Sequence, residues 1–205
     1  MSKGPFLFVI VFVFVFVFVF VFVFVAVGPF VFVISFSMSS YKQAKRTISL
    51  IILHCSATRE NQHFTVADIK RWHQQRGFVD CGYHLVVEQD GTISAGRPLT
   101  SIGAHCRNHN RNSIGICYVG GLDKDGHPAD TRNEAQKKSL RALLTQLHRD
   151  YPKAIILGHR DLSPDLNGDG KITPNEYIKR CPCFDAMVEY ADLQPAGLWE
   201  GKPIY

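Results

Sequence analysis

A single apolar segment, Phe6 to Val27, divides this chain into two parts with different physical behaviour. Val and Phe alternate along most of the segment, and its 22 residues would reach roughly 33 Å as a helix, enough to cross a lipid bilayer. Of the 15 Phe residues in the chain, 12 lie within the first 37 positions, whereas all 18 acidic residues follow them. A folded domain must therefore come from the later residues.

Three interpretations of the segment are open. A signal peptide would explain the small-x-small cleavage site Ala26-Val27-Gly28, but signal peptides usually carry about 7–15 apolar residues, fewer than this segment. A membrane anchor has the right length; Lys3 alone precedes it and three basic residues at 42–46 follow it, so the positive-inside tendency would place the domain in the cytoplasm. We favour the third interpretation, in which the repeat is translated low-complexity DNA and the natural chain starts at Met38.

The remaining residues have the charge content of an ordinary soluble domain. Without Lys3 the net charge of +5 becomes +4, and about a quarter of the later residues are charged. This composition excludes disordered, collagen-like and polytopic membrane proteins. The positive charges are spread over the whole chain, which hints at an anionic partner but gives no argument for nucleic acid, and we expect none; a cell-wall polymer suits this charge equally well. We expect a monomer with one domain at 47–192, a linker at 38–46 and a tail at 193–205.

Apolar runs predict the strands of this domain. The run from Ile48 to His54 predicts a buried strand with a histidine at its carboxyl end. Gln89-Asp90-Gly91 predicts the turn of a hairpin. The other strands are expected at 83–88 and 92–96 on either side of that turn, at 113–119, and at 154–157, just before Gly158-His159.

Capping signals place the helices. Residues 65–68 form a capping box that begins a helix ended by Gly77, and residues 131–134 form a second one ahead of a leucine stripe at 140–147. A last amphipathic helix is expected to begin near Phe184 and to carry Met187, Val188 and Leu193. Strands that alternate with helices predict an α/β fold, a single domain with a central mixed β-sheet flanked by helices.

Two of the predicted strands end in histidine, and a thiol lies just before the last helix. If the strands are neighbours, His54 and His159 converge at one edge of the sheet, where ligands bind in open α/β folds. Cys181 would add a thiolate. Two imidazoles and one thiolate leave one tetrahedral position of zinc free, which is typical of a catalytic site.

Six motifs resemble those of the type-2 N-acetylmuramoyl-L-alanine amidases, most closely the bacteriophage lysozyme-type enzymes, which share a fold with peptidoglycan recognition proteins. The resemblance covers about residues 47–190, and the motifs occur in the family's order. They are Leu53-His54-Cys55-Ser56-Ala57-Thr58, Gly82-Tyr83-His84, Asp90-Gly91-Thr92 to Ala95-Gly96-Arg97, Asn112-Ser113-Ile114-Gly115-Ile116, Gly158-His159-Arg160-Asp161, and Lys179-Arg180-Cys181-Pro182-Cys183-Phe184-Asp185.

The resemblance implies a set of site residues. It makes His54, His159 and Cys181 the zinc ligands, with Tyr83 and Lys179 as the catalytic pair beside the metal. A Lys ammonium and a Tyr hydroxyl can donate hydrogen bonds to the oxyanion formed when an amide is attacked. By the same resemblance, His105 would line the substrate cleft, outside this pair.

The function implied is zinc-dependent hydrolysis of the bond between N-acetylmuramic acid and L-alanine in peptidoglycan. Such an enzyme would be made in the cytoplasm of a bacterium or a phage-infected cell and act on the cell wall; a genuine apolar segment would anchor or export it. The alternatives are a non-catalytic peptidoglycan-binding module and an intracellular regulatory partner. Binding-only members of the wider fold family commonly lack the thiolate ligand, so Cys181 favours catalysis.

The segment between His159 and Cys181 departs from the phage pattern because it contains a sequence like an EF-hand loop. Oxygen ligands at positions one, three, five and twelve, with a backbone carbonyl at seven, would bind calcium. The alternative is an acidic turn without metal. The candidate calcium ligands are Asp165, Asn167, Asp169, Lys171 and Glu176.

The cysteine pattern favours free thiols in a reducing compartment. The six Cys residues have no spacing typical of a small secreted scaffold, and Cys55, Cys117 and Cys183 lie in or beside predicted strands and motifs. We do not expect Cys183 to be a second zinc ligand. A Cys81–Cys106 disulfide is the alternative pairing.

Overall fold

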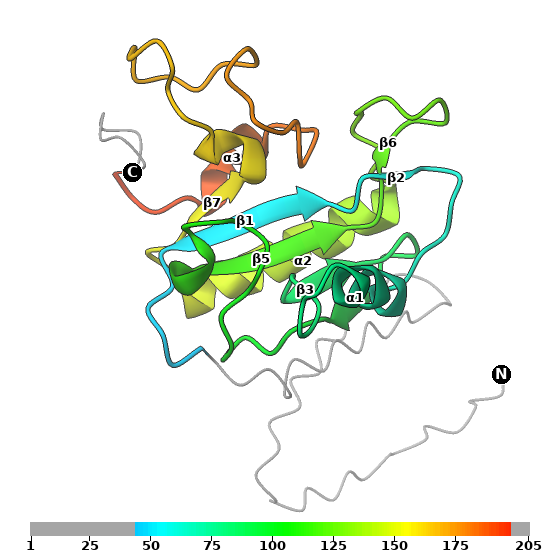
Figure 1. Ribbon diagram of the computed structural model, residues 1–205. Coiled ribbons are helices and arrows are strands. Elements are labelled where there is room, and N and C mark those ends of the chain that lie inside the picture. Colours follow the sequence, from blue (N-terminus) through cyan, green and yellow to red (C-terminus); the bar gives the residue numbers. More distant parts are fainter. Residues whose placement is uncertain (1–43, 198–205) are drawn as a thin grey trace, which may run out of the picture. The chain divides into compact units, whose positions relative to one another are not determined.

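The computed structural model of the chain describes residues 44–197 (Figure 1). The segment 1–37, most of the linker at 38–46 and most of the tail at 193–205 lie outside the described residues, so the interpretations of the apolar segment stay predictions. Within the described part, no helix combines the length and the apolar character needed to cross a membrane.

The core of the domain is a five-stranded sheet in the order β4-β3-β5-β1-β7. Strand β1 (Leu50–Cys55) lies between β5 (Ser113–Tyr118) and β7 (Ile155–Gly158) and runs parallel to both (Figure 1). All six residues of β1 are buried, as expected for an apolar run inside a parallel sheet. The two strands that lead to His54 and His159 are therefore neighbours, which is the condition for these histidines to converge.

The remaining strands make the sheet mixed. β3 (Leu85–Val87) runs parallel to β5, and β4 (Ile93–Ala95) pairs antiparallel with β3 as the predicted hairpin. Two short strands, β2 (Thr58–Arg59) and β6 (Gly121–Leu122), form a separate parallel pair. The predicted central mixed sheet is confirmed.

Helices cover both faces of this sheet. The leucine stripe of α2 (Glu134–Asp150) packs against Ile51 and Leu53 of β1. On the other face, Ile69 of α1 (Val66–Gln75) packs against the strands β3 and β5. Because side chains alternate along a strand, His54 points away from the face that α2 covers.

The start of α2 differs from the prediction. Its N-cap is Asn133, whose side chain accepts a hydrogen bond from Gln136 N, whereas Thr131 was expected to cap the helix. Thr131 instead accepts a hydrogen bond from Gly121 N on β6, at 2.7 Å. The first capping box is as predicted, because Asp68 accepts from both the backbone N–H and the hydroxyl of Thr65.

The last helix begins where predicted but is much shorter. Asp185 caps α3 (Ala186–Glu189), which gives way to a 3-10 turn, η4 (Ala191–Leu193). Val188 is 68% exposed, so the amphipathic pattern expected of it was wrong. Leu193 is buried in the core.

Candidate active site

Two histidines and a cysteine meet at the carboxyl ends of β1 and β7. The register pairs Leu53 with Gly158, so His54 and His159 follow side by side with ring centroids 4.8 Å apart. Cys181 comes from the loop before α3, and its Sγ lies 3.7 Å from His54 Nδ1. One ligand atom from each of the three residues lies within 4.8 Å of the others. The structure thus brings the three predicted metal ligands together.

The donor set fits a tetrahedral zinc ion. With Zn–N distances of about 2.1 Å and a Zn–S distance of about 2.3 Å, tetrahedral geometry separates nitrogen from sulfur by roughly 3.6 Å. The observed separation of His54 Nδ1 from Cys181 Sγ is 3.7 Å. Among the residues the structure describes, this is the one group of three or more His, Cys, Asp or Glu side chains close enough to share an ion.

The electrostatics of the site keep both imidazoles neutral. Burial, then the neighbouring His105, His159 and Lys179, lower the pKa of His54 well below its usual value. Burial, followed by the charge of Lys179, lowers the pKa of His159 to about 4. A neutral imidazole offers the nitrogen lone pair that a metal needs, so both histidines are ready to bind at neutral pH.

The thiol of Cys181 is held by contacts on both sides of the residue. Cys55 N–H donates to its Sγ at 3.2 Å, and Arg160 N–H donates to its carbonyl at 2.8 Å. The hydroxyl of Tyr118, at the end of β5, donates to the carbonyl of Pro182 at 2.8 Å. The ligand loop is therefore tied to β1, to β5 and to the turn that follows β7.

A buried arginine holds the next part of this loop. The guanidinium of Arg132 lies 3.2 Å from the ring centroid of Phe184 and pairs with Asp130 at 2.8 Å and Glu189 at 2.7 Å. The Arg132 side chain is 1% exposed, so these two carboxylates are needed to offset the cost of burying its positive charge. This cluster fixes the residues between the Cys181 loop and α3.

The predicted catalytic pair lies beside the ligands. The ring of Tyr83 is 5.1 Å from that of His54, and burial raises the pKa of its hydroxyl well above its usual value, which keeps it protonated. Lys179 is exposed, and its charge is among the causes that lower the pKa of both His54 and His159. Both side chains are hydrogen-bond donors at neutral pH.

The structure places His105 against His54, a candidate metal ligand. Its Nδ1 lies 3.1 Å from His54 Nε2, and its Nε2 lies 3.3 Å from Ser113 Oγ. The resemblance implies that this residue lines the substrate cleft. Its contact with His54 means that it can also affect a candidate metal ligand. Ser113 belongs to a motif that carried the resemblance, but the sequence assigned it no role.

A second residue that the sequence analysis missed is His73. Its Nδ1 accepts a hydrogen bond from Gly82 N at 2.8 Å, and its ring packs 5.3 Å from Tyr83. The signal was available, because His73 lies four residues after the buried Ile69 on the same helix face. His73 therefore supports the backbone just before Tyr83.

The EF-hand-like loop is closed by hydrogen bonds from its own backbone N–H groups to its acidic side chains. Asp165 accepts hydrogen bonds from Gly168 N at 2.7 Å and Gly170 N at 2.8 Å. Glu176 accepts from Thr173 N at 2.7 Å and from Leu166 N at 2.9 Å. These contacts build the turn without metal, and the acidic side chains of the loop form no group of three close enough to share an ion.

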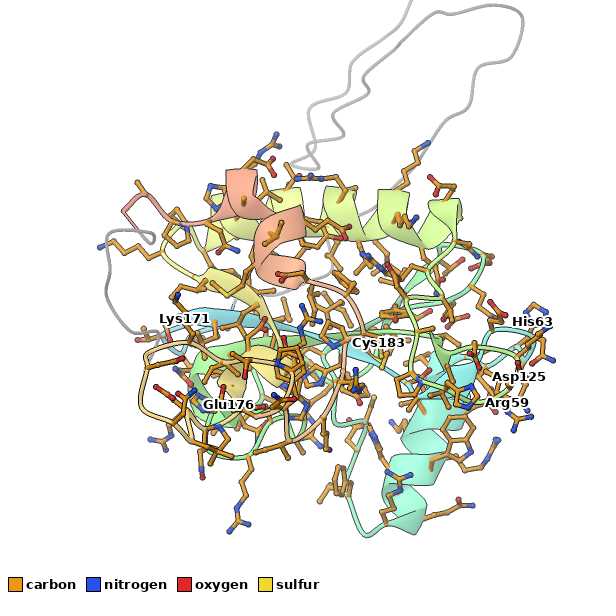
Figure 2. The ribbon with its side chains drawn as sticks, turned by 90° about the horizontal axis from the view of Figure 1, so that it is seen from above. Arg59, His63, Asp125, Lys171, Glu176 and Cys183 are labelled. Carbon is orange, nitrogen blue, oxygen red and sulfur yellow. The ribbon has the colours of Figure 1, made fainter. Side chains whose placement is uncertain are left out.

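In Figure 2 this loop lies apart from the loops around β2 and β6. Lys171 and Glu176 lie on one side of the molecule, Arg59, His63 and Asp125 lie on the other, and Cys183 lies between them. The EF-hand-like loop, residues 165–176, is followed in the chain by the loop that carries Cys181.

All six cysteines are free thiols, as the sequence predicted. Cys81 and Cys106 are buried and unpaired, so the alternative disulfide is not formed. Cys183 Sγ lies 3.9 Å from Cys55 Sγ and is not among the clustered ligand atoms.

Comparisons with known proteins agree with this geometry. The sequence model of a family described as N-acetylmuramoyl-L-alanine amidase matches residues 44–176. An uncharacterized protein of Haemophilus influenzae is 56% identical over 96 residues, which span 47% of this chain and 83% of that protein. The endolysin of Escherichia phage T7 is 38% identical over 145 residues, which span 71% of this chain and 86% of the endolysin.

A solved structure shares the fold. The N-acetylmuramoyl-L-alanine amidase LysC from Clostridium intestinale superposes with a TM-score of 0.55, covering 75% of this chain and 93% of that protein. The two sequences are 24% identical, so this likeness concerns the fold alone.

Proposed function

This chain belongs to the family of N-acetylmuramoyl-L-alanine amidases, which hydrolyse an amide bond of peptidoglycan, and on that premise we propose that zinc held by His54, His159 and Cys181 serves the reaction. The bond cleaved joins N-acetylmuramic acid to L-alanine. The observation that carries the proposal is the convergence of two neutral imidazoles and a thiol at one edge of the sheet.

Two side chains of the protein would stabilise the oxyanion that forms during the reaction. When bound, zinc supplies Lewis-acid chemistry, polarising the scissile carbonyl and lowering the pKa of water. Tyr83 holds a proton on its hydroxyl, and Lys179 carries an ammonium two residues before Cys181. Both groups would donate hydrogen bonds to the oxyanion as the amide carbon becomes tetrahedral. Lys179 is exposed, so it can approach a substrate from solvent.

The rival functions have less support. A module that only binds peptidoglycan has no need of a thiol held 3.7 Å from a strand-end imidazole. No observation favours an intracellular regulatory partner. We propose that one copy of the chain suffices, because all the candidate ligands and catalytic groups come from a single domain.

Metal removal tests the proposal. The full chain, incubated with purified peptidoglycan, should release peptides with a free N-terminal L-alanine and leave the glycan strands intact. Dialysis against a chelator should abolish this release, and one equivalent of zinc should restore it, because three protein ligands hold the ion. Mass spectrometry of the products measures the effect. Undiminished cleavage by metal-free protein would contradict the zinc proposal, and cleaved glycosidic bonds would contradict the amidase.

We also propose that the loop at 165–176 binds calcium when the ion is supplied. The support is the order of its oxygen ligands, together with Gly170, which has a φ of +79° that a side chain would disfavour. A carboxylate has about four lone-pair sites, so Asp165 and Glu176 can bind the ion while they still accept hydrogen bonds from backbone N–H groups.

Calcium should raise the melting temperature of the protein. At a hundredfold excess over the dissociation constant, binding stabilises the folded state by about 3 kcal/mol, or about 6–12 °C for a domain of this size. Glu176→Gln should abolish the rise while zinc content stays unchanged. The control is Glu60→Gln, an exposed carboxylate outside the loop. A melting temperature that ignores millimolar calcium in the wild-type protein would leave the loop as a metal-free turn.

A further inference from the structure

A chain of hydrogen bonds leads from the start of β5 to the ligand histidine of β1, and the direction of each bond can be assigned. Ser113 Oγ lies 2.6 Å from the carbonyl oxygen of His109. A carbonyl only accepts, so the single hydroxyl proton of Ser113 must point toward it. Ser113 Oγ is therefore left as an acceptor for its other neighbour, His105 Nε2, at 3.3 Å.

This assignment carries through both imidazoles. His105 Nε2 must bear the proton that Ser113 accepts, and a neutral imidazole then has a bare Nδ1. That Nδ1 lies 3.1 Å from His54 Nε2, so His54 must carry its own proton on Nε2. The lone pair of His54 is consequently on Nδ1, the atom that faces Cys181 Sγ at 3.7 Å.

We propose that Ser113 and His105 are positioning residues that fix the tautomer of His54, so that Nδ1 is its metal-binding atom. The inference rests on the proposed zinc function and goes beyond it, because it assigns a task to two residues that bind no metal themselves. A ligand histidine whose other N–H is anchored has a defined ring orientation and a more basic ligand atom.

The packing around His105 holds its ring in this chain. A Cβ atom on Gly115 would lie 2.4 Å from the ring, and one on Gly103 would lie 2.5 Å from it, so both positions must lack a side chain. The backbone is held as well, since Asn110 Oδ1 accepts from the N–H groups of His105 and Cys106, at 2.8 and 2.9 Å. The His105 ring therefore has little freedom to leave His54.

Nitrogen NMR of the histidine-labelled full chain tests the tautomers directly. We expect protonated Nε2 and unprotonated Nδ1 in both His54 and His105 of the metal-free protein. On addition of zinc, the Nδ1 signal of His54 should shift while its Nε2 stays protonated. A proton on His54 Nδ1, or zinc on His54 Nε2, would overturn the inference.

A pair of substitutions of similar shape tests the energetic role. His105→Leu removes the acceptor for His54 Nε2–H, and zinc affinity, measured by competition with a chromophoric chelator, should fall by about 10–100-fold. His105→Asn supplies a side-chain oxygen near the position of Nδ1 and should recover most of that loss. His127→Asn is the control, because the His127 side chain is 78% exposed and lies outside the chain of hydrogen bonds.

The two proposals fail in different ways. If the wild-type protein binds no zinc, the proposed function is wrong, and the tautomers of the metal-free protein still test the hydrogen-bond chain. If the wild-type protein binds zinc while the Leu and Asn variants bind it equally tightly, His105 has no positioning role. Should the Leu variant fail to fold, the Asn variant and the NMR assignment decide the matter.

Discussion

We expect Cys181→Ser to remove stoichiometric zinc and nearly all amidase activity. Three side chains of the described part of the chain converge at the proposed zinc site, and a serine hydroxyl does not ionise at neutral pH to replace a thiolate. Losing a group that merely hydrogen-bonds to a metal ligand costs about 10–100-fold in metal affinity, so losing a ligand itself should cost more than about 100-fold. Elemental analysis of the purified variant measures the zinc, and release of N-terminal L-alanine measures the activity.

The matched control for this prediction lies two residues away. Cys183 is also half-buried and close to Cys55, but it does not belong to the ligand cluster. Cys183→Ser should therefore keep both zinc and activity. His159→Ala should behave like Cys181→Ser, because it too removes one of three ligands. A Cys181→Ser protein with full zinc content and full activity would refute the ligand assignment.

Lys179→Ala and Tyr83→Phe should each lower kcat by roughly 10²–10³ without loss of zinc, the cost of one hydrogen-bond donor to an oxyanion. Tyr83→Phe removes only the hydroxyl and keeps the ring that packs against His54 and His73, so folding should be unaffected. Lys179→Ala removes an exposed charge that contacts solvent. Steady-state kinetics with a soluble muropeptide separate kcat from KM.

Two further variants make the kinetic test specific. Lys153→Ala removes an exposed lysine between α2 and β7 and should leave kcat unchanged. Lys179→Arg keeps the positive charge but changes its shape, and should recover part of the lost rate if charge matters more than donor geometry. A normal kcat in both Lys179→Ala and Tyr83→Phe would contradict the proposal that these residues donate hydrogen bonds to the oxyanion.

Much of the fold could be predicted because its signals are local. The buried run at β1, the Gln-Asp-Gly turn and the capping box at Thr65 each depend on a few consecutive residues, and the structure has all three. The second capping box shows the limit of such signals. Thr131 has the right spacing to cap α2, but its hydroxyl accepts from Gly121 N across the fold, and Asn133 becomes the cap.

For the candidate site, too, some features could be predicted from the sequence and others could not. The sequence by itself indicated the types of the candidate metal ligands and placed two of them at or just after the ends of strands, because apolar runs that stop at or near a histidine can be read along the chain. Tertiary structure alone decided that β1 lies between β5 and β7, that Leu53 pairs with Gly158, and that His105 reaches His54. The physical reason is that strand register and side-chain hydrogen bonds join residues distant in sequence, and their geometry exists only after the sheet has packed.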